Sequence, residues 1–264
     1  MKPQFDFVSL LITGPGMMLV AVMGVIIWRR AARVPMGWFW AGAALWAVAV
    51  AMKVAIALAT NAAVFGWMKH ALSHSLFVAG GSLWLGFLTG ITEIGLTFAA
   101  VLRWRQLGAD ANRAIAVGVG AGAIEALILG LAQFAGVIAL QTGAPGTEPI
   151  RKQWEAGIAV TPLFWLTPII ERLIALLCHA ASRALVLLGV AHRKPMMVAG
   201  SFVMFTLLDS VAGVFFLTGK VGRISSWWIE LAVLPFALAS LLILRGCYRR
   251  WPKSSAVTAN PSTP

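Results

Sequence analysis

The sequence predicts an all-α membrane protein, a polytopic bundle of about seven transmembrane helices. Of its 264 residues, 60% are hydrophobic and only 11% are charged, whereas about a quarter of the residues in a soluble domain are charged. The mean hydropathy of +0.86 indicates that most of the chain leaves water. The apolar runs are long enough to cross a hydrocarbon layer, which takes roughly 20 residues. They lack the alternation of a membrane β-strand, so each is expected to form a helix that satisfies its own backbone.

Seven apolar runs qualify as spans, and they divide the chain into one domain and a tail. The runs cover residues 8–28, 36–60, 76–102, 114–140, 160–191, 196–218 and 226–246. Residues 1–253 are expected to form a single transmembrane helical domain. The Ser-, Thr- and Pro-rich stretch 254–264 is expected to be a disordered cytoplasmic tail. The long connection at 141–159 is either an ordinary loop or contains a short interfacial helix at 150–154.

The distribution of basic residues predicts the orientation. The net charge of +12 is divided among short connections, so it does not form the single basic patch of a nucleic-acid-binding protein. One set of connections holds twelve Lys and Arg residues and the alternate set holds six. The richer set comprises Arg29, Arg30, Arg33, Arg103, Arg105, Arg113, Arg193, Lys194, Arg245, Arg249, Arg250 and Lys253. The positive-inside rule therefore predicts a multi-pass protein of the inner (cytoplasmic) membrane, with its N-terminus outside and its C-terminus in the cytoplasm.

Several ionisable side chains fall inside the predicted spans, where each charge costs about 2.5–3.5 kcal/mol. Four neighbouring spans each place one of them, Glu93, Glu125, His179 or Asp209, at a similar depth, so we expect the group to meet in a shared, hydrated pocket. These candidate site residues are Glu93, Glu125, Glu171, Arg172, His179 and Asp209. Lys53 and Arg183 also fall in spans, but their long side chains are expected to snorkel to the membrane surface.

Helical periodicity places the buried carboxylates on helix–helix interfaces. Glu93 and Glu125 each follow two glycines at i−7 and i−3, which are Gly86 and Gly90, and Gly118 and Gly122. Such small-residue stripes allow helices to approach closely. Arg172, His179 and Arg183 share one face of the fifth span through their i, i+7, i+11 spacing. The buried ionisable residues of the four spans are interpreted either as a functional site or as an ion-pair network that only sets helix register.

Four segments together resemble a known family. They are GITEIGLTF (90–98), GVGAGAIEALILG (118–130), ERLIALLCHAASRALV (171–186) and FTLLD (205–209). In order and spacing, over about residues 75–218, they are similar to the YhfC family of bacterial intramembrane peptidases of the glutamic type. That family is distantly similar to the CAAX-protease and bacteriocin-processing membrane proteases.

The family patterns are close to FEExxR, GxGHGxxEA, ER followed by a histidine, and HxxxD. The matching residues here are Glu93, Glu125, Glu171, Arg172, His179 and Asp209. The departures are Thr92 for a glutamate, Leu96 for an arginine, and Ala121 and Phe205 for histidines. The resemblance implies that Glu125 or Glu93 acts as the base, with His179 as oxyanion partner and Asp209 as orienter. The departures equally allow the shell of a site that no longer hydrolyses peptides.

The sequence therefore predicts an intramembrane peptidase that acts on a membrane-embedded or membrane-proximal peptide within the lipid bilayer. A non-catalytic scaffold or accessory protein on the same fold is one alternative. A small transporter or proton relay is another, because such relays use buried carboxylates with a histidine. No cofactor or metal is expected: no HExxH occurs, although Glu, His and Asp side chains from several helices leave a zinc site open.

Overall fold

The computed structural model describes residues 7–251, and over that range the chain is helical. The tail predicted at residues 254–264 lies outside the described residues. The long helices are α1 (Phe7–Ala32), α2 (Gly37–Ala71), α3 (His74–Thr89), α4 (Gly95–Arg103), α5 (Ala111–Gln141), α6 (Glu148–Val160), α7 (Thr167–Ala191), α8 (Pro195–Leu217) and α9 (Trp227–Arg250). A π-helical turn, Gly90–Ile94, joins α3 to α4, and 3-10 turns at Arg105–Gly108 and Phe164–Leu166 precede α5 and α7.

Seven helical segments of this described range are long and apolar enough to cross a membrane, which confirms the predicted fold class. The third of them is α3 and α4 together, and within residues 7–251 the helix α6 lies outside all seven segments. Large apolar side chains cover the outside of the bundle: Leu58, Leu242 and Val8 are 81%, 72% and 70% exposed. Side chains of this kind are stable on a surface that faces hydrocarbon.

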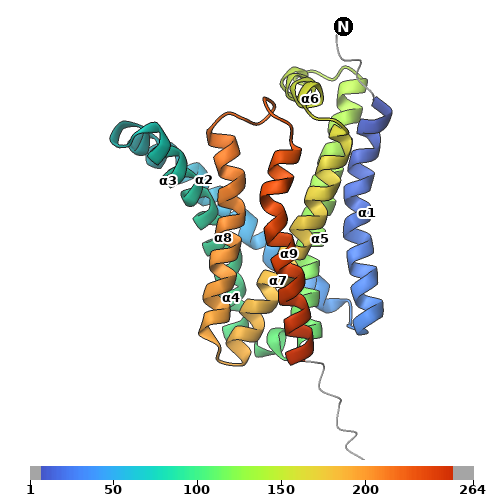
Figure 1. Cartoon of the computed structure of the whole chain (residues 1–264). Helices are drawn as coiled ribbons and strands as arrows, with labels where there is room; N and C mark the ends of the chain where they lie inside the picture. Colours follow the sequence, from blue (N-terminus) through green and yellow to red (C-terminus); the bar gives the residue numbers. More distant parts are fainter. Residues whose placement is uncertain (1–6, 252–264) are drawn as a thin grey trace, which may run out of the picture.

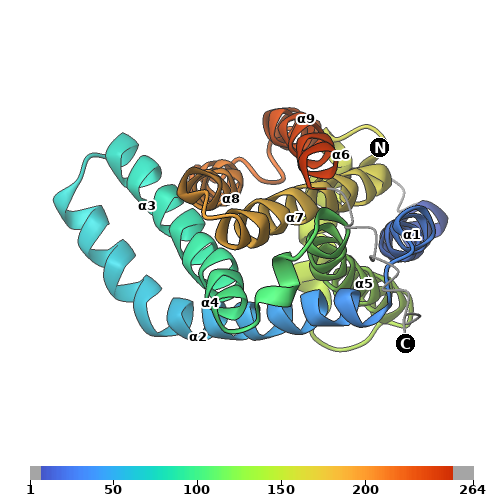
Figure 2. The ribbon, with the colours of Figure 1, turned by 90° about the horizontal axis from the view of Figure 1, so that it is seen from below.

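Two helices, α5 and α7, form the centre of the bundle, and the remaining spans surround them (Figure 2). The sequence of α5 explains its place, because its first half consists mostly of buried Ala, Gly and Val. At the crossing with α2, a Cβ on Gly42 would lie 1.8 Å from the carbonyl oxygen of Val117. A Cβ on Gly120 would likewise lie 2.0 Å from the carbonyl oxygen of Phe39. The two backbones therefore touch, and only glycine fits on either side.

The α2–α3 hairpin leans away from the bundle (Figures 1 and 2). Helix α2 continues to Ala71, so the predicted end of this span at residue 60 is wrong. Polar side chains at the expected end bond within the hairpin instead of stopping the helix. The Thr60 hydroxyl donates to the carbonyl of Ile56 at 2.7 Å, and Asn61 accepts from the indole of Trp84 at 2.9 Å.

The ends of the described chain lie on opposite sides of the bundle. Helix α1 begins at the end that carries α6 and the α8–α9 connection, and α9 ends beside the α7–α8 turn (Figure 1). This arrangement agrees with an odd number of crossings. Of the two expectations for the connection at 141–159, a helix is the one observed: α6 covers Glu148–Val160 and is longer than the expected 150–154. Its Trp154 packs against Leu10, Val137 and Leu140 at that end.

Candidate functional site

A cavity of about 380 Å³ lies between α2, α5, α7, α8 and α9. All six residues that the sequence predicts as a site line it, together with one lysine from α2. The ionisable lining residues are Lys53, Glu93, Glu125, Glu171, Arg172, His179 and Asp209. The acids and the histidine from separate spans are thus brought to one place, as expected from their common depth.

The π-helical turn positions Glu93, and periodicity did not predict this turn. A π-turn widens the helix by one residue and disturbs the regular backbone hydrogen bonds. Two threonine hydroxyls bond to nearby carbonyls: Thr92 donates to Leu88 and Thr97 donates to Glu93, each at 2.7 Å. The Glu93 side chain points into the bundle and is only 3% exposed.

Two cations hold the Glu93 carboxylate. Arg183 Nη2 donates to Glu93 Oε2 at 2.8 Å, and Lys53 Nζ lies 3.4 Å from Oε1. The Arg183 side chain is 0% exposed, and Lys53 also donates to Thr89 and lies 4.0 Å from Asp209. The expectation that Lys53 and Arg183 snorkel to the membrane surface is therefore wrong. Buried carboxylates at mid-span provide a better partner than distant headgroups.

Both oxygens of Glu125 are also occupied. Arg172 donates to Oε1 and also bonds to Glu171, while His179 Nε2 lies 2.6 Å from Oε2. Arg183 Nη1 lies 2.6 Å from His179 Nδ1, and because a guanidinium can only donate, Nδ1 accepts. His179 thus bridges Arg183 on Nδ1 and Glu125 on Nε2.

These contacts connect into one chain of ionisable and polar side chains from six elements, which are α2, α3, the π-helical turn, α5, α7 and α8. Its order is Glu171, Arg172, Glu125, His179, Arg183, Glu93, Lys53, Asp209 and Thr89. Four carboxylates face three cations and a histidine, so opposite charges nearly balance within the cluster. Near-neutrality is what hydrocarbon surroundings demand of a charged cluster.

The glycine stripes pack as the periodicity predicted. A Cβ on Gly122 would lie 2.9 Å from Leu176 Cα, so α5 lies directly against α7. On the other carboxylate-bearing segment, a Cβ on Gly86 would lie 2.1 Å from the carbonyl oxygen of Thr206, so α3 lies against α8. Glu93 and Glu125 therefore face other helices and not lipid.

Sequence reasoning missed Lys53 and Arg183 as members of the cluster, and it missed Trp46 in the cavity wall. The signal for Arg183 was present, since it lies four residues beyond His179 on the same helix face. The indole N–H of Trp46 and the Nε–H of Arg172 are buried and have no hydrogen-bond partner among the described residues. Both belong to residues that line the cavity.

The donor set does not fit a metal ion. Within residues 7–251, no three His, Cys, Asp or Glu side chains are grouped as metal ligands. Both nitrogens of His179 are engaged, and a guanidinium faces each of Glu93 and Glu125 where a metal would have to bind. Phe205, whose ring centre is 4.9 Å from that of His179 and 5.6 Å from the Arg183 guanidinium, adds an apolar wall. A metal site needs unprotonated donors free of competing cations.

Comparison with known proteins agrees with the family resemblance. No curated protein and no solved structure matches the chain. Residues 16–233 match the family described as YhfC intramembrane metalloprotease, a range that includes every residue of the charged cluster. On this match over most of its length, the chain belongs to the YhfC intramembrane metalloprotease family.

Proposed function

We propose that this multi-pass membrane protein binds a membrane-embedded or membrane-proximal peptide in the polar cavity and hydrolyses a peptide bond by carboxylate chemistry. One observation carries the proposal: four carboxylates, two cations and a histidine from different spans line one cavity within the bundle, and a third cation, Arg183, is paired with Glu93 behind its wall. Hydrolysis within a bilayer requires polar groups that admit water, and a cluster of this kind supplies them.

The family description implies a metal, whereas the sequence predicted glutamic-type chemistry. Because the residues around the cavity do not fit a metal ion, no step of the proposed reaction uses one. The positive charge that a metal would bring is supplied by Lys53, Arg172 and Arg183, which already face the carboxylates.

Among the cluster carboxylates, Asp209 suits the role of base. Its Oδ2 accepts from Thr89 and lies 4.0 Å from Lys53, but Oδ1 has no partner among the described residues. Its side chain is 38% exposed, in contrast to 3% for Glu93. Glu125 has Arg172 on one oxygen and His179 on the other, so neither oxygen is free to accept a proton from water. We assign Glu93 and Glu125 to holding the cations in place, and Asp209 to proton transfer.

The reaction then proceeds in two steps. Asp209 takes a proton from water as the water oxygen forms a bond to the peptide carbonyl carbon. Lys53, beside Asp209, donates to the oxyanion that develops. The carbon–nitrogen bond then breaks, and the proton on Asp209 passes to the leaving amine, so that the carboxylate is restored.

A non-catalytic peptide-binding protein is the second candidate, and one observation favours it. Phe205, which stands where the family pattern has a histidine, packs directly on His179. An apolar ring there contributes no proton transfer. On this alternative the cavity holds a peptide but leaves it intact.

The two candidates differ in turnover, so we would measure binding and cleavage together. The purified protein in proteoliposomes receives a fluorogenic peptide that carries one transmembrane segment. Asp209→Asn and Lys53→Met are expected to lower turnover by roughly 10²–10⁴-fold while peptide binding persists. Glu148→Gln is the control, because its side chain is 65% exposed on α6, away from the cavity. EDTA is expected to leave turnover unchanged.

Each other outcome is decisive. Binding by the wild type without turnover would establish the second candidate. Full turnover by Asp209→Asn would remove Asp209 from the reaction. Loss of turnover in EDTA with recovery in zinc would refute the metal-independent chemistry.

A further inference from the structure

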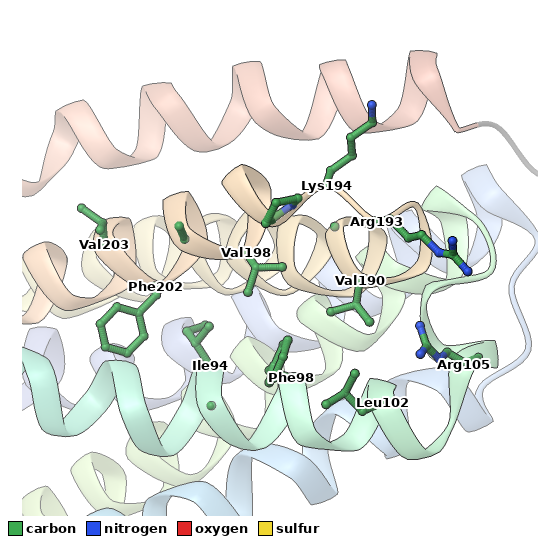
Figure 3. Close-up of a pocket in the computed structure, with 14 residues that line it drawn as sticks. Ile94, Phe98, Leu102, Arg105, Val190, Arg193, Lys194, Val198, Phe202 and Val203 are labelled. Atoms are coloured by element: carbon green, nitrogen blue, oxygen red, sulfur yellow. The ribbon is translucent and has the colours of Figure 1, made fainter.

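A second and larger cavity, of about 760 Å³, opens along the side of the bundle between α4, α7 and α8 (Figure 3). It shares no lining residue with the polar cavity. Its walls are almost entirely apolar. They are formed chiefly by Ile94, Phe98, Leu102, Val198, Phe202 and Val203. We call this cavity the lateral groove.

One end of the lateral groove is cationic. Arg105 follows α4, Arg193 lies in the α7–α8 turn, and their guanidinium groups approach each other at this end (Figure 3). Lys194 also lines the groove, although its ammonium extends away from the two arginines (Figure 3). Neither arginine makes a salt bridge to a carboxylate within the described part of the chain. Two unpaired guanidinium groups at one point constitute a site for an anion.

The backbone at Arg193 supplies an independent observation. Arg193 closes α7 in a left-handed conformation, with φ of 55°, and Lys194 N bonds back to the carbonyl of Gly189 at 2.7 Å. Glycine is the residue that usually occupies such a position, because a side chain there is strained. An arginine in this place costs conformational energy, so its replacement by glycine is expected to leave the fold intact.

We propose that the lateral groove binds an anionic phospholipid. The acyl chain lies along the apolar wall, and the phosphate lies between Arg105 and Arg193. The ligand follows from polarity: the groove is apolar along the spans and cationic where they end, which matches an anionic lipid in the adjoining leaflet. Basic pockets between transmembrane helices recognise lipid headgroups in this way. This site does not depend on the function proposed for the polar cavity.

Lipid retention by the purified full-length protein tests the proposal. Native mass spectrometry in a zwitterionic detergent would measure binding of phosphatidylglycerol, with phosphatidylcholine and oleate as comparison probes. Each arginine near a phosphate contributes about fivefold in affinity, so Arg105→Gln and Arg193→Gly together are expected to weaken phosphatidylglycerol binding roughly 30-fold. In the wild type, phosphatidylcholine is expected to bind more weakly than phosphatidylglycerol. In the double variant, the two lipids are expected to bind equally.

The Arg193→Gly variant separates binding from folding. Glycine relieves the left-handed strain, so the variant is expected to unfold at the wild-type temperature or above while it loses lipid. Arg33→Gly is the matched control: Arg33 is also exposed, with φ of 51°, in the α1–α2 connection outside the groove. It is expected to retain phosphatidylglycerol fully.

A groove-filling variant, Ala199→Trp, tests the acyl-chain part of the proposal, since Ala199 lines the groove with an exposed side chain. It is expected to lose phosphatidylglycerol and oleate alike. Equal binding of phosphatidylglycerol and phosphatidylcholine by the wild type would overturn the proposal. So would an equal loss in Arg33→Gly and Arg193→Gly, or full retention in Ala199→Trp. If the wild type retained no phosphatidylglycerol, the proposal would be overturned in favour of a different occupant, such as an acidic peptide segment.

Discussion

The ion pair between Glu93 and Arg183 offers a quantitative test of how the cluster stabilises the fold. Both side chains are almost fully enclosed, at 3% and 0% exposed, and their charged atoms are 2.8 Å apart. Glu93→Gln removes one charge and leaves Arg183 buried without its carboxylate. Breaking one side of a buried pair costs about 3–5 kcal/mol, because the remaining charge is neither paired nor hydrated.

At about 2–4 °C for each kcal/mol in a chain of this size, that cost lowers the unfolding midpoint by roughly 6–20 °C. The measurement is the loss of helical circular dichroism on heating in detergent. Lys152→Gln is the control: it removes an exposed pair to Glu148, whose atoms are 3.8 Å apart, and is expected to cost at most about 1 kcal/mol.

The double variant Glu93→Gln/Arg183→Met completes the cycle. It removes both charges, and Lys53 keeps Asp209 as a neighbour at 4.0 Å, so at least half of the loss should be recovered. The reasoning would be refuted if Glu93→Gln unfolded within about 1 kcal/mol of the wild type. Simple addition of the two single effects in the double variant would refute it as well.

Three further predictions concern packing and orientation. Gly42→Ala places a methyl group 1.8 Å from the Val117 carbonyl oxygen and should destabilise the folded protein by roughly 1–3 kcal/mol, measured by thermal unfolding. Gly66→Ala is the control: its methyl group would have nothing within 4 Å, so the change should be neutral or slightly stabilising. Phe205→Ala should cost roughly 3–5 kcal/mol by the same measurement, since the ring is 2% exposed against His179, and a cost below about 1 kcal/mol would show that the wall collapses to fill the gap. In a bacterial host, a fluorescent protein fused to the C-terminus should fluoresce, whereas alkaline phosphatase inserted at 219–226 should be active; the reverse pattern would overturn the predicted orientation.

Much of the architecture followed from the sequence because the hydrocarbon layer of a bilayer requires long apolar helices. Each span must be apolar for about 20 residues, so the number of crossings could be counted in the chain itself. The spacing of Gly118, Gly122 and Glu125 indicated which face of α5 meets a neighbour, since a helix repeats every 3.6 residues. The same constraint predicted that acids at one depth would gather around a cavity.

Other features arose only when the helices packed. The π-helical turn that directs Glu93 inward has no signature in hydrophobic periodicity. The partnership of Glu93 and Arg183 joins residues that lie 90 positions apart in the chain. Arg183 could reach either a membrane surface or a buried carboxylate, and local sequence does not distinguish these outcomes.

Composition and spacing thus determined that this protein lies in a membrane, that it is helical and which of its charged residues are buried. Each of these properties depends on residues close together in the chain. The tertiary structure decided which oxygen each cation binds, which carboxylate keeps a free oxygen, and where the lateral groove opens. Those properties depend on distances between helices, and these are determined by side chains of several spans packing at once.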